Sequence, residues 1–241
     1  MKTVGIHQPN FMPWLGYFYK IWQSDTFIFL DDVQIQKTGA SYTNRVSINN
    51  GKSQYVTMPI KKDSSNLNIN EVKYLDERWK KKLLGTLQAN YGKTSFFKEN
   101  KNFIFDLINF KADNLAQYNM NFIIKIADKL NLNTRFIKSS EFLLNTNSTQ
   151  RLIDLIKKVD GNIYLSGSGG DNYQDKEMYE KENIKLIYNK MPKYEYPQLK
   201  TEVFIGGLSI VDAIFNIGFD KLKQDLFHNG NLNNLSNIQA S

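Results

Sequence analysis

The beginning of the chain alternates between short apolar runs and one helical pattern, and this order restricts the fold more than any other feature. Thr3–Ile6 is a strand-like apolar run that ends at His7, and Phe27–Leu30 is a second one that ends at Asp31-Asp32. A strand, a helix and a second strand predict the opening of a parallel α/β sheet. The apolar residues between the two runs have helical spacing: Trp14, Leu15, Phe18, Ile21 and Trp22.

Polar side chains follow both predicted strands. The carboxyl ends of parallel strands meet at one edge of a sheet, and ligands gather there. If the two strands are neighbours, His7, Asp31 and Asp32 lie on the same edge. An imidazole with an unperturbed pKa near ~6.5 suits general-base catalysis, and either aspartate can bind a metal, a sugar hydroxyl or an amine. A structural histidine and strand-end or turn acids are the alternatives.

The middle of the chain predicts a hairpin followed by helices. Arg45–Ile60 holds two alternating runs around Asn49-Asn50-Gly51, and Asn-Gly favours a tight hairpin turn. From Asp76 to about Asn131 apolar residues recur at helical spacing, which predicts a helical insertion, and Gly92 ends the first of its helices. The apolar positions of the three helices are Trp79, Leu83, Leu87 and Tyr91, then Phe103, Leu107 and Ile108, then Leu115, Phe122, Ile123, Ile126 and Leu130.

The remaining chain returns to α/β character. We expect strands near Thr134–Ile137, Asn162–Leu165 and Ile184–Tyr188, with helices over Ser148–Lys158 and Ser209–Ile217. Ser209 can cap the last helix and Gly218 can end it. The prediction is a single α/β domain over residues 1–228, a mainly parallel sheet flanked by helices, with the helical insertion at about 76–131. Residues 229–241, rich in Asn, Gly and Ser, are expected to be a disordered tail.

Composition narrows the partners. The formal net charge is +7 and the pI is about 9.2, but the basic residues are spread out, so we expect a solvated surface or a phosphate-bearing small substrate and no nucleic acid. The chain has no cysteine, which excludes disulfides, thiolate nucleophiles and cysteine-ligated metals. No apolar run approaches about 20 residues and no leader precedes the first strand, so we expect a cytoplasmic protein that does not use a membrane.

Three further groups are candidates for ligand binding. Lys37, Asn44 and Arg45 can clamp a phosphate, or can be surface residues. The loop Ser166-Gly167-Ser168-Gly169-Gly170 follows a predicted strand and is either an anion-binding nest or an ordinary turn; it lacks the lysine of a P-loop. Tyr194, Tyr196 and Gln198 can line a sugar or base pocket, or lie at the edge of the core.

Several of these segments together resemble one family. They are the run from His7 to Phe18, Asp31-Asp32, Asn44-Arg45, Tyr164-Leu165-Ser166-Gly167, Leu208-Ser209-Ile210-Val211-Asp212 and Phe215-Asn216-Ile217-Gly218. The chain resembles the WbqC-like family over nearly its whole length. The resemblance implies a bacterial protein of O-antigen or other surface polysaccharide biosynthesis, acting on a nucleotide-linked amino sugar.

The resemblance leads us to expect transfer of an acyl or aminoacyl group, glycyl being one candidate, to the sugar amine. His7 would act as base, Asp31 or Asp32 would orient the amine, and Arg45 or the Ser166–Gly170 loop would hold the diphosphate. The remaining expected substrate contacts are Gln8, Asn10, Trp14 and Tyr17. We assign no metal and no resident cofactor; ATP or an activated acyl or aminoacyl donor would be the co-substrate.

The opening also resembles the HIGH-type nucleotidylyltransferase fold, which implies a core of the HUP class. Trp14 and Tyr17 stand where the two histidines of that signature would be expected. Nucleotidylyl or adenylyl transfer is therefore the alternative reaction, and a non-catalytic sugar-nucleotide-binding or assembly protein is the alternative outside enzymes.

Overall fold

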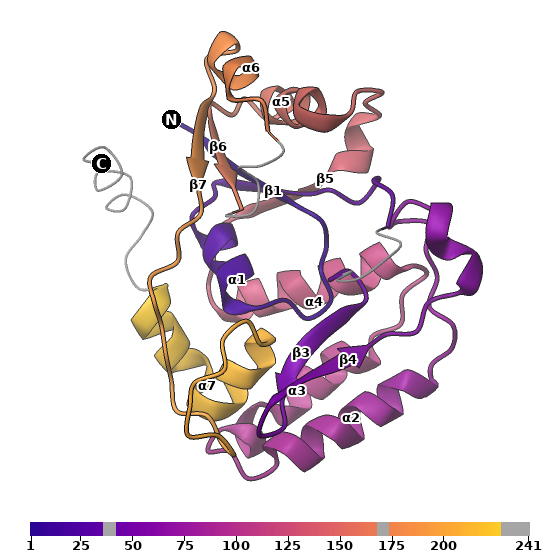
Figure 1. The fold of residues 1–241 in the computed structure, drawn as a ribbon, viewed down its shortest axis with the longest axis vertical. Coiled ribbons are helices and arrows are strands. Elements are labelled where there is room, and N and C mark those ends of the chain that lie inside the picture. The colour runs from indigo at the N-terminus through magenta and orange to yellow at the C-terminus, as the bar shows by residue number, and fades with distance from the viewer. Residues whose placement is uncertain (36–41, 168–173, 228–241) are drawn as a thin grey trace.

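A five-stranded parallel sheet organises the protein (Figure 1). The computed structural model describes residues 1–35, 42–167 and 174–227. The strand order is β5-β2-β1-β6-β7, and each neighbouring pair is parallel, which confirms the predicted α/β class. The strands are β1 (Thr3–His7), β2 (Thr26–Phe29), β5 (Arg135–Lys138), β6 (Ile163–Ser166) and β7 (Lys185–Tyr188). The helices are α1 (Leu15–Trp22), α2 (Arg78–Tyr91), α3 (Phe97–Asn109), α4 (Leu115–Lys129), α5 (Ser148–Lys158), α6 (Lys176–Lys181) and α7 (Ile210–Leu226), with short 3-10 segments η1 (Lys62–Asn66) and η2 (Ser139–Phe142).

The two faces of the sheet are covered by different helices. Val4, Ile6 and Ile28 pack with the apolar side of α5, while Phe27 and Phe29 belong to the large core that includes α1 and α4. Figure 1 shows α5 on one side of the sheet and α1 and α4 on the other. Both faces are buried at the central strands β1, β2 and β6, which are apolar runs, whereas the edge strands β5 and β7 begin with exposed Arg135 and Lys185. Each fully buried aliphatic or aromatic side chain contributes roughly 1.5–3 kcal/mol.

The register of β1 and β2 puts their carboxyl ends side by side. His7 pairs with Phe29, and the amide of Leu30 donates to the carbonyl of His7 at 2.9 Å. The next residues of the β2 side are Asp31 and Asp32. The prediction that His7 and these aspartates share one edge of the sheet is therefore confirmed.

A second group of elements packs below the sheet in Figure 1. The antiparallel hairpin β3 (Arg45–Asn49) and β4 (Ser53–Thr57) lies with α2, α3 and α7. The hairpin is confirmed at the predicted turn, where Gly51 has φ +75° and its amide donates to the Asn49 side chain at 2.8 Å. The three predicted helices of the insertion correspond to α2, α3 and α4.

The last helix differs from the prediction. Ser209 caps it as expected, since its hydroxyl accepts from the amide of Val211 at 3.3 Å. The first helical segment ends at Gly218 as predicted, because Gly218 leaves the helical conformation with φ +77°. The second segment, which continues α7 to Leu226, was not predicted. The short helix α6, capped by Asp175, was not predicted. The predicted tail over 229–241 lies outside the described residues.

Candidate active site

The sheet has a switch point between β1 and β6, where the chain connections change from running toward β5 to running toward β7. From β1 the chain continues through α1 to β2 and later β5 on one side, while β6 continues through α6 to β7 on the other. In open α/β sheets, ligands bind beyond the carboxyl ends of the strands at such a point. The strand ends that meet there are His7 on β1 and Ser166 on β6.

His7 is held in one neutral tautomer. Its Nδ1 lies 3.1 Å from the carbonyl oxygen of Gln8, which can only accept, so Nδ1 carries the proton and Nε2 is an acceptor without a donor among the described residues. The ring stands edge-on to Tyr17, with 4.9 Å between centroids. Burial, with the nearby charge of Lys20, lowers the pKa of His7 to about 3, although the Gln8 contact opposes this. The imidazole is therefore neutral at physiological pH and a weaker base than we expected.

Lys20 is a functional candidate that the sequence analysis missed. Its side chain is 2% exposed, and its ammonium donates to the carbonyl of Ile6 at 2.7 Å. Within the described part of the chain it has no carboxylate partner, and burial lowers its pKa to about 7. The available signal was a lysine inside an otherwise apolar helix, between the buried residues Tyr19 and Ile21.

On the β6 side of the switch point, polar side chains have hydrogen-bond acceptors without a donor among the described residues. Gln174 donates to the hydroxyl of Ser166 at 2.8 Å, and Asn189, just after β7, donates to the carbonyl of Gly16 at 3.0 Å. The side-chain oxygens of Gln174 and Asn189 are buried and have no donor among the described residues. A β-carbon added at Gly167 would meet no described atom within 4 Å, whereas Ser168 and Gly169 lie outside the described residues.

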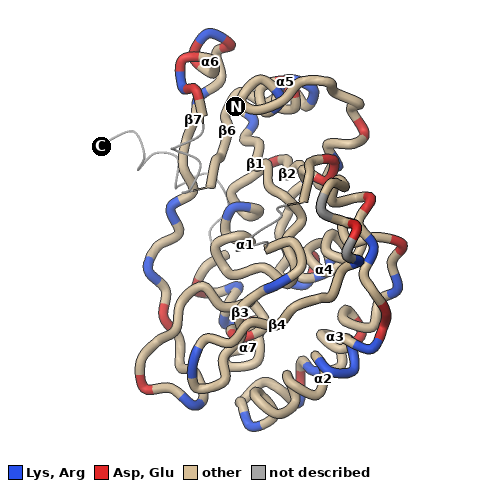
Figure 2. The backbone as a smooth tube through the Cα atoms, turned by 45° about the vertical axis from the view of Figure 1, so that its right-hand side comes forward, with Lys and Arg blue, Asp and Glu red and all other residues tan. Residues whose placement is uncertain are grey.

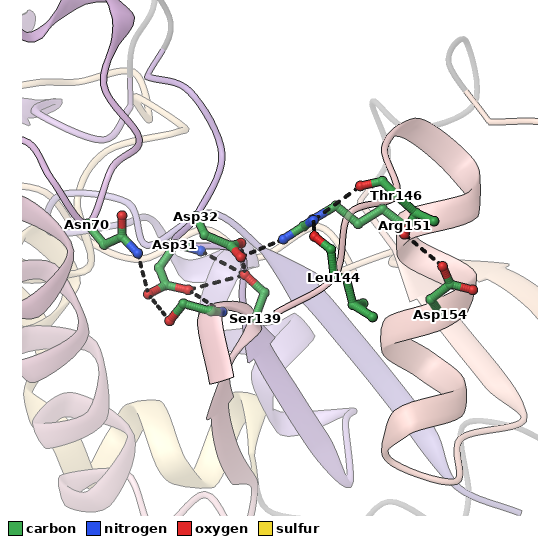
Figure 3. Close-up of polar contacts among 9 residues, drawn as sticks. Asp31, Asp32, Asn70, Ser139, Leu144, Thr146, Arg151 and Asp154 are labelled. Carbon is green, nitrogen blue, oxygen red and sulfur yellow. Dashed lines mark hydrogen bonds and ion pairs between the residues drawn. The ribbon is translucent and has the colours of Figure 1, made fainter. Parts of the chain in front are cut away.

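Asp31 and Asp32 turn toward β5 (Figure 3). The chain has already bent after β2, because the amide of Asp31 donates to the carbonyl of Phe29 at 3.0 Å. The Asp31 carboxylate accepts from the hydroxyl of Ser140 at 2.8 Å and from its amide at 3.0 Å, and also from Ser139 and Asn70. With 2% of its surface exposed, Asp31 ties the end of β2 to η2.

Asp32 connects the same edge to α5. Its carboxylate lies 2.6 Å from the guanidinium of Arg151 and also accepts from the Ser139 hydroxyl. Figure 3 shows the Arg151 side chain extending from α5 toward Asp32. Its guanidinium also donates to the carbonyls of Leu144 and Thr146, which precede α5. These contacts indicate a structural role for both aspartates. The Asp32 side chain is 18% exposed, so a ligand can still reach it.

A polar cavity opens beside the two aspartates. It has a volume of about 690 Å³ and lies between the ends of β2 and β5, the beginning of α4 and the segment 68–71. Carboxylates and amides dominate its walls, with one lysine. The polar residues that line it are Asp31, Asp32, Asn68, Asn70, Glu71, Asp113, Asn114, Gln117, Lys138 and Ser140.

Much of the predicted motif after β1 is core. Asn10 is 2% exposed, and the carbonyl of Gln8 accepts from the Tyr17 hydroxyl at 2.8 Å. Burial raises the pKa of Tyr17, so its phenol stays protonated. Trp14, at the start of α1, bridges to Ser209 and packs edge-on to Tyr17. The structure thus places Gln8, Trp14 and Tyr17 around His7.

Asn44 and Arg45 start the hairpin and lie close to the motif loop. Asn119 donates to the carbonyls of both Pro9 and Thr43, at 2.8 and 2.7 Å, and so joins the two segments. The Asn44 amide donates to the carbonyl of Met58 at 3.1 Å, and the guanidinium of Arg45 stacks 3.8 Å from the centre of the Tyr55 ring. No described contact joins either residue to His7, and Lys37 lies outside the described residues.

Tyr194 and Gln198 are placed against α7 and not at the sheet edge. The Tyr194 hydroxyl donates to Asp225 at 2.7 Å, and the Gln198 amide donates to Asp212 at 2.9 Å. Tyr196 donates to the same Asp212 at 2.8 Å. Burial raises the pKa of Asp212. These residues connect the segment after β7 to the last helix.

Figure 2 shows both basic and acidic positions spread along the backbone. The two signs are mixed within α4 and α5, whereas α2 carries only basic residues, Arg78 and Lys80-Lys81-Lys82. In the described ranges there is no cluster of three or more histidine, aspartate or glutamate side chains suited to a metal ion. No helix among the described residues has the length and apolar character needed to cross a membrane.

The fold and this edge define an α/β protein with a parallel sheet whose strand order reverses beside His7. The sequence comparisons agree with the predicted resemblance: the model of the WbqC-like protein family matches residues 8–224, and the chain belongs to that family. An uncharacterised Mycobacterium tuberculosis protein, Rv1507c, is 29% identical over 221 residues, which cover 90% of this chain and 95% of the relative. No solved structure gives a significant match.

Proposed function

We propose that this WbqC-like protein is a transferase that adds an acyl or aminoacyl group, such as glycyl, to the amine of a nucleotide-linked amino sugar. The observation that carries the proposal is the reversal of strand order at His7 and Ser166, where sheets of this kind bind nucleotide ligands. The family resemblance supplies the amino sugar, and the reaction is expected to belong to surface polysaccharide biosynthesis.

The sheet edge has room for both halves of such a substrate. Neighbouring strands lie about 4.8 Å apart, so β2, β1 and β6 span roughly 10 Å. The diphosphate would lie beyond β1 and β6, near the amide of Gly167, and the sugar would enter the cavity beside Asp32. Carboxylates and amides in that cavity match the hydroxyls and the amine of an amino sugar.

His7 would act on the amine from the strand between these two parts. Its unprotonated Nε2 accepts a hydrogen bond from the attacking nitrogen and orients the lone pair toward the acyl carbon. A C–N bond forms, the bond from the acyl carbon to its leaving group breaks, and the leaving group departs with that electron pair. One proton leaves the nitrogen for the leaving group or solvent. A donor activated as a thioester, or as an acyl phosphate made with ATP, satisfies this balance.

The test is turnover. Purified protein is incubated with a panel of nucleotide-linked amino sugars and activated acyl or aminoacyl donors, with and without ATP, and the sugar is analysed by mass spectrometry. A mass gain on the sugar, lowered about tenfold or more in His7→Ala, is the expected result. His7→Gln, which keeps an acceptor, should retain more activity than His7→Ala at equal folded content by circular dichroism.

Two outcomes would contradict acyl transfer. Pyrophosphate release with a nucleotidyl group added to the substrate would favour nucleotidylyl chemistry. Binding of the nucleotide sugar without turnover, unchanged in His7→Ala, would indicate a non-catalytic binding or assembly protein.

A further inference from the structure

The hydrogen-bonded ladder between β1 and β6 ends before either strand ends. The last paired residues are Gly5 and Leu165, although β1 continues to His7 and β6 to Ser166. In a parallel sheet, successive residues direct their carbonyls to alternate neighbours. The carbonyls of Thr3 and His7 accept from Asp25 and Leu30, on the β2 side, so that of Ile6 points toward β6.

The ammonium of Lys20 occupies the place where the ladder stops. It donates to this Ile6 carbonyl at 2.7 Å, although Lys20 belongs to α1. The side chain therefore brings a cation to the gap between the two strands, next to His7, whose protonation its charge opposes. An ammonium has three N–H donors, and Ile6 is its hydrogen-bond acceptor among the described residues.

A second lysine shows how this fold satisfies a buried ammonium elsewhere. Lys80 on α2 is 4% exposed and also donates to a carbonyl, that of Phe110, at 2.7 Å. Unlike Lys20, it has a carboxylate partner, Glu77, at 2.5 Å. Buried cations are costly unless they are paired. Lys20 has no such carboxylate among the described residues, and it lies at the point of the sheet where the strand order predicts a ligand.

We propose that Lys20 is the anion-binding residue of the switch point, where its ammonium binds a phosphate oxygen of a diphosphate-bearing ligand. This inference takes from the proposed function only that the ligand is a nucleotide. It does not depend on the transfer reaction. The neighbouring groups suit the same ligand. The Ser166 hydroxyl donates to the Gly167 carbonyl at 3.3 Å and can turn this bond toward a phosphate oxygen, and a β-carbon added at Gly167 would meet no described atom within 4 Å. Lys20, bound to the carbonyl of Ile6 on β1, and Ser166 on β6 would then both donate hydrogen bonds to the diphosphate.

The experiment measures binding of inorganic pyrophosphate and of a nucleoside diphosphate by calorimetry at low salt. Lys20→Met should weaken both about tenfold or more, as expected for loss of a charge-assisted hydrogen bond. Lys80→Met, which removes a buried lysine remote from the switch point, should change binding less than about twofold. Lys20→Arg should retain part of the affinity.

A measurement on the unaltered protein covers the case in which Lys20→Met folds poorly. The Lys20 side chain is followed by NMR as pH is varied, with and without pyrophosphate. Its pKa, about 7 in the free protein, should rise by at least about one unit when the anion binds, because an opposite charge favours the ammonium. A purely structural cap on Ile6 would titrate identically in both samples.

The inference is overturned if pyrophosphate does not bind, or binds with Lys20 titrating unchanged, or binds equally to Lys20→Met. Sugar acylation that persists with unaltered nucleotide affinity in Lys20→Met would remove Lys20 and leave the proposed function standing. Diphosphate binding through Lys20 without any acyl transfer would support the role of Lys20 and contradict the proposed function.

Discussion

The ammonium nitrogen of Lys20 lies 2.7 Å from the main-chain oxygen of Ile6, and no carboxylate in the described part of the chain pairs with it. Its pKa falls from 10.5 to about 7 on folding, so between these values the unfolded chain binds a proton that the folded protein does not hold fully. Stability from this group is complete above the unfolded pKa and is lost as pH falls.

We predict that the free energy of unfolding rises by about 2 kcal/mol more in the wild type than in Lys20→Met between pH 7 and pH 9. Urea denaturation at several pH values, in buffer free of phosphate, measures this difference. Lys80→Met should keep the wild-type slope, and equal slopes for wild type and Lys20→Met would show that Lys20 titrates normally.

His7 gives a second pH prediction. Its folded pKa of about 3 lies below the ordinary value of 6.5, so its contribution is complete above pH 6.5 and is lost as pH falls toward 3. At pH 5 the wild type should have lost about 2 kcal/mol from this source, and His7→Gln should lose correspondingly less. NMR should find the His7 ring neutral at pH 5; a ring that titrates near pH 6.5 would refute the burial effect.

Asp31 is predicted to matter mainly for folding. Asp31→Ala leaves the hydroxyl and amide of Ser140 without their acceptor in a buried place, and we expect a loss of about 3 kcal/mol in chemical denaturation. The control is Asp128→Ala, which removes an exposed ion pair with Lys125 at 4.0 Å and should cost less than about 0.5 kcal/mol. Similar losses in both variants would contradict the tie between β2 and η2.

Gly218 and Gly85 form a matched pair of glycines within helices. Gly218 has φ +77° and an added β-carbon would lie 2.7 Å from Phe96, so Gly218→Ala should destabilise the protein by more than about 1 kcal/mol. Gly85, on the exposed side of α2, has nothing within 4 Å, and Gly85→Ala should stabilise by about 0.5–1 kcal/mol. Thermal denaturation compares them, and opposite signs are expected.

The parallel arrangement of β1 and β2 was predictable because local patterns specify it, whereas the position of β6 beside β1 was not predicted. Two apolar runs separated by a helical pattern already indicate parallel strands, and β1 and β2 pair with His7 opposite Phe29. The hairpin and most helices follow from turn chemistry and from the spacing of apolar residues. Gly218 was ambiguous, because a glycine that ends a helix and one that kinks it look alike until Phe96 packs against it.

The partners within the site depend on contacts far apart in the sequence. Asp31 and Ser140 are separated by 109 residues, and nothing local indicates that their hydrogen bonds hold two strand ends together. The capping of Ile6 by Lys20 depends on where the β1–β6 ladder stops, which is a property of the assembled sheet. Asn10 in the motif after His7 was expected to contact the substrate, yet it is 2% exposed and the residues that follow it, Phe11 and Met12, are core residues.

The place where a nucleotide-linked amino sugar binds is most directly tested by a crystal structure of the wild type with that ligand. We predict the diphosphate beyond the ends of β1 and β6, within hydrogen-bonding distance of the Lys20 ammonium, with the sugar directed toward Asp32. Ligand found instead in the cavity of about 250 Å³ between β4 and α2, lined by Phe11, Tyr55 and Trp79, would contradict it.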